Sequence, residues 1–184
     1  MEDPNSRKLA DIAYEQRHLD RERERIAGFD PLAKADELGA LRRNLVALLD
    51  LPTGAQVLDY GSGPCEVSEY LAAGGARPVA VDMFPGYLQA TRQRTAQRGG
   101  PAPRYVIGDG ERLPFSDGVF AAAICSEVLH HVPDPALGAS EIFRTLQPGA
   151  VCLVVEPNAL SPLRRVKERV NRRREHIMER SFYP

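Results

Sequence analysis

The residues of this sequence with the clearest chemical potential are a short glycine loop and two aspartates. The loop Gly61-Ser62-Gly63 follows an apolar run that ends in Asp59 and Tyr60, and Asp82 ends the next apolar run. Glycines one residue apart let the backbone turn tightly and approach a ligand without an intervening Cβ. Asp59 can pair with a cationic group such as an ammonium, and Asp82 can accept hydrogen bonds from ribose hydroxyls. This spacing predicts a site for a ligand that carries a ribose and an amine.

The residue three positions after Gly63 restricts the class of ligand further. It is Glu66, where the dinucleotide fingerprint Gly-x-Gly-x-x-Gly requires a third glycine. A carboxylate there, with Asp59 in front of it, suits a pyrophosphate poorly. The loop therefore favours a ligand without phosphate, and it disfavours a nicotinamide-dependent oxidoreductase.

These residues need a fold that brings them together, and the sequence predicts one. Apolar runs alternate with helical stretches, which is typical of an α/β fold with a doubly wound, mostly parallel sheet covered on both faces. Such sheets bind ligands at the carboxyl ends of their strands, where carboxylates stand in this sequence. Five strands are expected at 56–60, 78–82, 104–108, 119–125 and 150–156, with helices at 64–73, 86–97 and 135–146.

The chain is predicted to form a single domain over residues 1–184. Residues 1–35, with a helix at 6–27, are expected to form a helical lid over the cleft. The Rossmann-like core is expected at 36–157, opening with a helix at 36–49 that carries Leu38, Leu41, Leu45, Leu48 and Leu49 on one face. Residues 158–184 are predicted to be a basic amphipathic helix, interpreted as a solvated face rather than a phosphate or membrane patch.

Composition limits the classes of function. The net charge of −1 gives no general attraction to nucleic acid, and no apolar run approaches the length that a membrane span needs. The charged N-terminus does not resemble a secretory signal, and the three cysteines lack metal-ligand spacing. We therefore expect a cytoplasmic protein with no metal, no nucleic-acid partner and no membrane span.

Five segments in this order resemble the motifs of the class I methyltransferases. The resemblance is to the form found in small-molecule enzymes such as the ubiquinone/menaquinone group. The segments are VLDYGSG at 57–63, VAVDM at 79–83, GDGERLPFSDGVF at 108–120, VLHHVPD at 128–134 and RTLQPGA at 144–150. The resemblance implies a methyltransferase that uses S-adenosyl-L-methionine and acts on a small-molecule acceptor. One departure is Cys65, where the family commonly has a small residue, often glycine.

The resemblance also implies roles for individual residues. Asp59, Tyr60, Gly61 and Gly63 would hold the methionine moiety, with Ser126 lining the same end. Asp82 would bind the ribose hydroxyls. Met83 would pack on the adenine, Asp109 would accept from its amino group, and Gly110 would let the ring lie close to the backbone.

Candidates for the catalytic base follow the fourth and fifth predicted strands. His130, His131 and Glu156 are expected near the cleft, where one of them could remove a proton from a hydroxyl acceptor. The alternative for each histidine is a packing or loop-capping role, since methyl transfer can proceed by positioning alone.

The end of the chain bears on catalysis. Family members usually continue into two further strands that cover the sheet edge, so this chain is expected to be a fragment or a shortened protein. A homodimer or a missing C-terminal segment would then cover the strand at 150–156. The main alternative function is a non-catalytic module that binds S-adenosylmethionine. An RNA methyltransferase is disfavoured by the near-neutral charge and by the form of the third motif.

Overall fold

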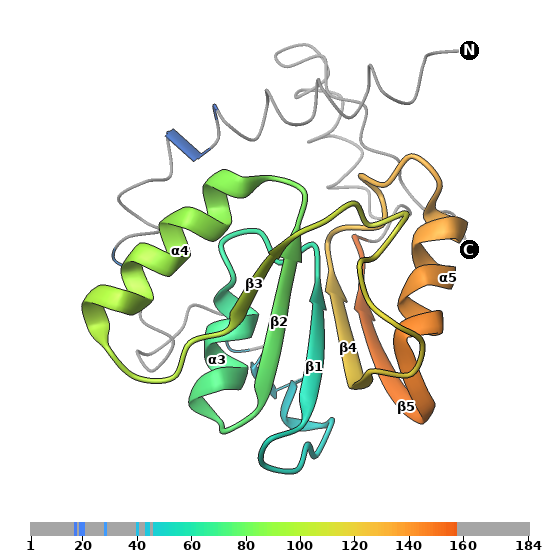
Figure 1. Ribbon diagram of the computed structural model, residues 1–184, viewed down its shortest axis with the longest axis horizontal. Coiled ribbons are helices and arrows are strands. Elements are labelled where there is room, and N and C mark those ends of the chain that lie inside the picture. Colours follow the sequence, from blue (N-terminus) through green and yellow to red (C-terminus); the bar gives the residue numbers. More distant parts are fainter. Residues whose placement is uncertain are drawn as a thin grey trace.

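The computed structural model describes residues 17, 19, 20, 28, 40, 43, 44 and 46–157. Within them lies a five-stranded parallel sheet in the order β3-β2-β1-β4-β5 (Figure 1). The strands are β1 (Gln56–Tyr60), β2 (Arg77–Asp82), β3 (Arg104–Ile107), β4 (Phe120–Ser126) and β5 (Leu146–Val155). The helices are α3 (Glu66–Ala73), α4 (Pro85–Arg98) and α5 (Pro135–Thr145).

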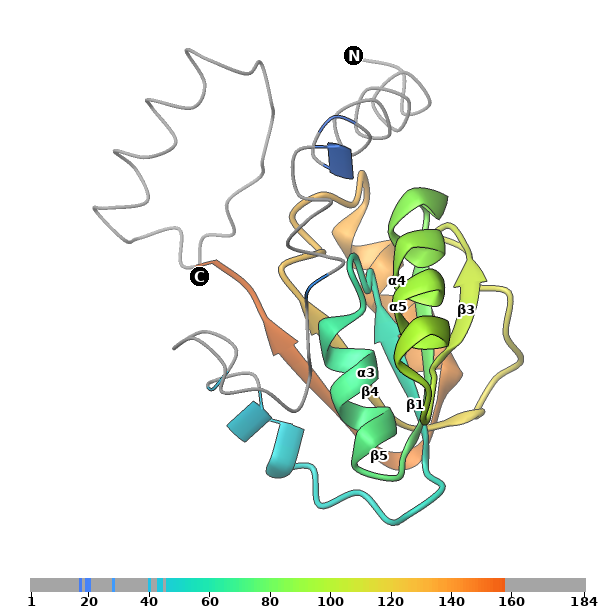
Figure 2. The same ribbon diagram turned by 90° about the vertical axis from the view of Figure 1, so that its left-hand side faces the viewer.

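The central strands are apolar on both sides because helices cover both faces of the sheet. On one face, Leu58 and Val81 share a core cluster with Ile142 of α5. On the other face, Val57 packs with Leu71 of α3, and Ala80 packs with Leu88 of α4. Figure 2 shows α3 and α4 side by side along the sheet. This arrangement confirms the predicted doubly wound α/β fold.

The direction of winding reverses between β1 and β4, which are neighbours in the sheet. From β1 the chain proceeds outward through β2 to β3, and it then crosses back to β4 and β5. Loops that leave the carboxyl ends of β1 and β4 therefore diverge to opposite faces and leave a crevice between them. The glycine loop and Ser126 both lie at this reversal point.

Three local differences separate the structure from the sequence-based expectation. Helix α3 begins at Glu66, so Pro64 lies in the preceding turn and not in the helix. Strand β5 begins at Leu146, which pairs with Phe120 ahead of a register shift, and so takes in residues expected to form a loop. Leu48 lies in a turn and is 79% exposed, whereas Val46 is the buried residue that packs on β1. In each case contacts with distant residues decide the local outcome.

Most of the predicted lid at 6–27 and all of the basic helix at 158–184 lie outside the described residues. Leu19 is an exception, since it is described and is buried against Phe84 and Tyr87 at the start of α4. Closure of a lid therefore stays a prediction. Among the helices of the described part, none combines the length and the apolar character that crossing a bilayer would require.

Candidate active site

The loop after β1 has an alternating backbone conformation. Gly61, Gly63 and Cys65 have φ angles of 65°, 49° and 57°, all in the left-handed region that favours glycine. A Cβ on Gly61 would collide with the side chain of Val128, which follows β4. A Cβ on Gly63 would have nothing among the described residues within 4 Å. Gly61 thus closes the loop against β4, while Gly63 borders open space in which a ligand can approach the backbone.

Cys65 explains why the methyltransferase motif favours a small residue, often glycine, at this position. Its φ of 57° is unfavourable for any residue with a Cβ, at a cost of about 1–2 kcal/mol. The thiol is buried, and its sulfur lies 3.4 Å from both the Ser62 hydroxyl and the Gly63 carbonyl. Burial raises the pKa of Cys65 to about 12, so the side chain is an unreactive thiol that packs inside the loop.

Asp82 ties the loop to the start of α4. Its Oδ2 accepts the backbone N–H of Gly63 at 2.7 Å, and its Oδ1 accepts that of Phe84 at 2.8 Å. Asp82 is only half-buried. It therefore organises the loop from a position that is open to solvent in part.

Asp59 lies beneath the loop rather than on its surface. Its side chain is buried, and its Oδ2 accepts a hydrogen bond of 2.6 Å from the hydroxyl of Ser68 in α3. The carboxylate joins β1 to α3 directly below the point where the loop begins. Its predicted contact with a ligand ammonium remains an expectation.

Tyr60 points to the opposite face of the sheet from Asp59. Its ring is buried in the cluster on the α5 side, where burial raises the pKa of the phenol. A Cβ on Gly110 would collide with the Tyr60 hydroxyl, and one on Gly138 would lie 2.6 Å from it. The Tyr60 side chain therefore leaves no space for a larger residue at position 110, a reason that the sequence did not suggest. The Tyr60 hydroxyl has no hydrogen-bond partner among the described residues, and the predicted role of Tyr60 in the site stays a prediction.

Two further candidates lie at the rim formed by the ends of β2 and β3. Met83 is half-buried directly after β2. Asp109 is exposed after β3, and its Oδ1 accepts the Glu111 N–H at 3.0 Å in a tight turn. Both side chains are accessible from the rim, as a contact with a bound ligand would require.

Ser126 ends β4, and its side chain has an unusual environment. The hydroxyl is buried and has no hydrogen-bond partner among the described residues. A buried hydroxyl without a partner is unfavourable by about 1–3 kcal/mol unless a water or ligand supplies one. Ser126 lies at the reversal point beside the glycine loop, where a role in ligand binding stays a prediction.

Two of the three predicted catalytic residues are in contact. His130 is buried, and its Nδ1 lies 2.6 Å from Oε2 of Glu156, which follows β5. Glu156 Oε1 also accepts the backbone N–H groups of Val128 and Leu129, at 3.0 and 2.8 Å. Burial opposes ionisation of Glu156, but these hydrogen bonds outweigh it and lower its pKa below the ordinary value. The result is a histidine held in one orientation by an ionised carboxylate.

His131 packs its ring against that of His130. The ring centroids are 4.1 Å apart and the planes are tilted by 41°. The three candidates thus form one group at the ends of β4 and β5. No cluster of histidine, cysteine, aspartate and glutamate within the described ranges could hold a metal ion.

The sequence analysis missed a set of polar residues that contact the loop from below. Thr91 and Arg94 of α4 are both buried and both donate to the carbonyl of Pro64. Charged helix residues are usually solvated, so Arg94 gave no direct signal. Its position three residues after Thr91 placed it on the same helix face, and that spacing was the available clue.

Comparison with known proteins identifies the family. Residues 58–154 match the family model described as a methyltransferase domain. The chain is 38% identical over 115 residues to the demethylmenaquinone methyltransferase of Mycobacterium sp. (strain KMS), which covers 62% of this chain and 47% of that protein. The chain therefore spans about half the length of the curated relatives it matches.

Solved structures agree with this family. A Bacillus halodurans C-125 protein assigned to the methyltransferases has a TM-score of 0.67 and 28% identity, covering 77% of this chain and 62% of its own. A [4+2]-cyclase shares the fold with a TM-score of 0.63 and 23% identity, over 73% of this chain and 52% of its own. The fold alone thus accommodates other reactions, whereas the sequence match over the glycine loop and the strand ends is more specific. The chain belongs to the class I methyltransferase family, whose cofactor is S-adenosylmethionine.

Proposed function

We propose that this protein transfers a methyl group from S-adenosylmethionine to a small organic acceptor. The observation that carries the proposal is that the segment matching the family includes the strand ends where β1 and β4 diverge. There the open side of Gly63, the Asp82 carboxylate and the unpaired hydroxyl of Ser126 lie at neighbouring strand ends. When bound, the cofactor supplies a methyl group already activated by its sulfonium.

The residues present fit this cofactor. The half-buried Asp82 carboxylate would accept from the ribose hydroxyls, and Ser126 offers a donor and acceptor to the methionine end. Gly63 leaves room for close approach to the backbone. Met83 would pack on the adenine, and the exposed Asp109 would accept from its amino group. Asp59 supports the loop from below through Ser68.

His130 is the group best placed to accept a proton from a hydroxyl acceptor. Glu156 holds Nδ1 at 2.6 Å, which fixes the ring and favours a proton on that nitrogen. The other ring nitrogen is then the proton acceptor, in the manner of a carboxylate-oriented general base. We assign Glu156 the role of orienting His130, and His131 that of packing on its ring.

The acceptor is proposed from the relatives. Several curated relatives at 36–38% identity carry the name demethylmenaquinone methyltransferase. We therefore propose a quinol-like small molecule as the acceptor, and demethylmenaquinol is the first compound to assay. A non-catalytic module that binds S-adenosylmethionine is less well supported, since these relatives are named as enzymes.

Calorimetric titration with S-adenosylhomocysteine tests the cofactor assignment, with NAD as the comparison ligand. We expect binding of S-adenosylhomocysteine only. Asp82→Ala should weaken that binding by about 1–3 kcal/mol in a folded protein. Binding of NAD but not S-adenosylhomocysteine would refute the proposed function, and unchanged affinity in folded Asp82→Ala would refute the ribose assignment.

Transfer of a labelled methyl group from S-adenosylmethionine to demethylmenaquinol tests the assignment of His130 as the base. His130→Gln should lower the rate of transfer about 100-fold or more while leaving the affinity for S-adenosylhomocysteine unchanged. His131→Gln, which removes the ring packed against His130, should lower the rate much less. The reverse order of the two variants would assign the base to His131, and equal rates in all three proteins would mean that transfer needs no base here.

A further inference from the structure

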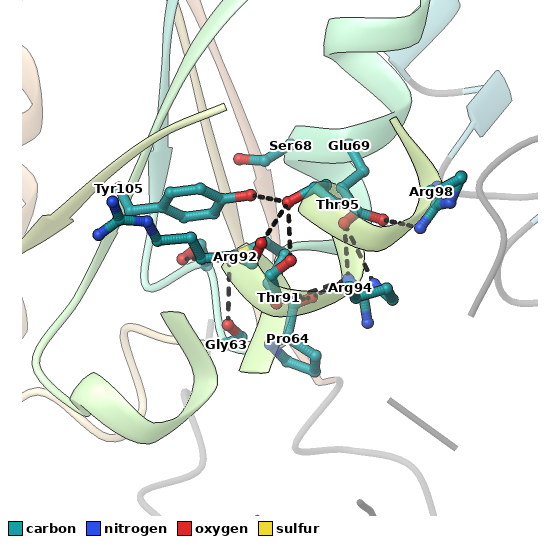
Figure 3. Close-up of polar contacts among 12 residues, drawn as sticks. Gly63, Pro64, Ser68, Glu69, Thr91, Arg92, Arg94, Thr95, Arg98 and Tyr105 are labelled. Atoms are coloured by element: carbon teal, nitrogen blue, oxygen red, sulfur yellow. Dashed lines mark hydrogen bonds and ion pairs between the residues drawn. The ribbon is translucent and has the colours of Figure 1, made fainter. Parts of the chain in front are cut away.

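A buried polar cluster lies between α3 and α4, below the glycine loop (Figure 3). Its centre is an ion pair in which the Arg94 side chain is 3% exposed and the Glu69 side chain 1% exposed. Arg94 Nε and Nη2 lie 3.1 and 3.0 Å from Oε1 of Glu69. Arg98 approaches the other oxygen of Glu69 at 3.3 Å from the partly exposed end of α4.

The cluster contacts the loop at the carbonyl of Pro64. The carbonyl oxygen of Pro64 accepts two hydrogen bonds of 2.9 Å, one from Arg94 Nη2 and one from the Thr91 hydroxyl. The Arg98 side chain, which contacts the same carboxylate of Glu69, is 31% exposed and so lies at the edge of the cluster. Figure 3 shows Thr91 and Arg94 converging on Pro64 from α4.

Pro64 lies between two residues with left-handed backbone conformations. It stands between Gly63 and Cys65, which have φ angles of 49° and 57°. At the preceding residue, the backbone N–H of Gly63 donates a hydrogen bond to the Asp82 carboxylate. The loop is therefore held from two sides, by Asp82 through Gly63 and by Thr91 and Arg94 through Pro64.

The energetics of burial argue for more than helix packing. A buried ion pair contributes little net stability, because the cost of removing both charges from water offsets their attraction. Apolar residues between α3 and α4 would pack the helices at least as well. A guanidinium offers several donors in fixed directions, so it can hold a carboxylate and a carbonyl at once. That property suits the placement of a backbone segment.

We propose that Thr91 and Arg94 are positioning residues for cofactor binding, which hold the glycine loop through the Pro64 carbonyl while Glu69 orients Arg94. The inference rests on the proposed function, since it assigns the loop to the cofactor. It predicts that the loop keeps its left-handed conformation at Cys65 only while these two donors are present. Loss of either donor should lower the affinity for the cofactor, although neither side chain is proposed to contact it.

The test compares Thr91→Val, Thr91→Ser, Arg94→Met and Arg98→Met in the full chain. Thr91→Val removes one donor with almost no change of shape, and Thr91→Ser restores it. Arg98→Met removes the other arginine that pairs with Glu69, from the partly exposed edge of the cluster, so it is the matched control for Arg94→Met. The readouts are the dissociation constant for S-adenosylhomocysteine and the exchange rate of the Cys65 amide, which donates to the Ser62 carbonyl at 2.8 Å.

We expect Thr91→Val and Arg94→Met to weaken binding about tenfold, equivalent to about 1.4 kcal/mol, and to speed exchange of the Cys65 amide without ligand. Thr91→Ser and Arg98→Met should match the wild type in both readouts. If Arg94→Met does not fold, Thr91→Val alone decides. Unchanged binding and exchange in Thr91→Val, or equal losses in Arg98→Met and Arg94→Met, would overturn the inference. If the wild-type chain binds no S-adenosylhomocysteine, the proposed function is refuted. Faster exchange of the Cys65 amide in Thr91→Val would then still support the role of Thr91 in holding the loop.

Discussion

At the scale of single residues, Cys65 shows how a motif can be kept while one of its residues is replaced. Its φ of 57° would suit glycine, yet its thiol fills the interior of the loop with contacts to Ser62 and Gly63. The backbone strain and the buried contacts oppose each other. The preference of the family for a small residue here follows from the backbone conformation that the loop requires.

Substitution of Cys65 separates these two effects. Cys65→Gly and Cys65→Ala both remove the thiol, but only glycine relieves the left-handed strain. We expect Cys65→Gly to be more stable to unfolding than Cys65→Ala by about 1 kcal/mol. In an ordinary helical position alanine is the more stable of the two by a similar amount. Chemical denaturation of both variants measures the difference, and a more stable alanine variant would show that the loop does not hold this conformation in solution.

At the scale of elements, Arg144 on α5 fastens the segment between β3 and β4. It donates to the carbonyls of Phe115 and Leu113 at 2.8 and 3.2 Å, and it pairs with Asp117 at 2.7 Å. Glu141, one helical turn earlier, pairs with Arg144 and accepts the Leu113 N–H at 2.8 Å. The hydrogen bond and ion pair with Arg144 lower the pKa of Glu141 despite some opposing desolvation. The segment thus follows α5 rather than forming a free loop.

Removal of the Arg144 contacts should make the segment that follows Asp109 more mobile. We expect Arg144→Met to speed amide exchange at Leu113 and to lower the free energy of unfolding by about 1–3 kcal/mol, because carbonyls and carboxylates lose a charged donor. Affinity for S-adenosylhomocysteine should fall severalfold as Asp109 becomes less well placed. Arg92→Met, on the exposed face of α4, is the control and should change none of the three quantities. An effect on stability without any on Leu113 exchange would contradict the assigned role.

At the scale of the whole molecule, β5 is the outermost strand on one side of the sheet. Only β4 pairs with it among the described strands. Val151 and Val154 are 56% and 49% exposed, and Phe143 on the adjacent α5 is 80% exposed. Apolar side chains along an outer strand with free backbone donors and acceptors favour pairing between chains.

We expect this chain to self-associate at high concentration through that edge. Val151→Lys should reduce the association, because a charge on an outer strand opposes strand pairing. Sedimentation velocity over a range of concentrations measures the effect. Binding of S-adenosylhomocysteine should be unchanged, since Val151 lies in the middle of β5 and not at its carboxyl end. Identical sedimentation of the variant and the wild type would place the contact elsewhere or exclude it.

The sequence by itself determined the elements and the end of the sheet where the site lies. Periodicity and the alternation of apolar runs with helices placed all five strands, since strands buried on both faces must be apolar throughout. The glycine loop and the acids after the strands identified the rim, because parallel strands bring their carboxyl ends to one edge. Resemblance at the five motifs then gave the family, which the comparisons confirmed.

The tertiary structure decided which partner each of these residues has. It paired His130 with Glu156, buried Asp59 under the loop, turned Tyr60 against Gly110, and placed Arg94 under Pro64. None of these contacts follows from local spacing, because each joins residues far apart in the chain whose distance depends on how the elements pack. Periodicity along the chain determines the face that a residue occupies. Which side chain lies opposite it is determined only by the packing of the whole molecule.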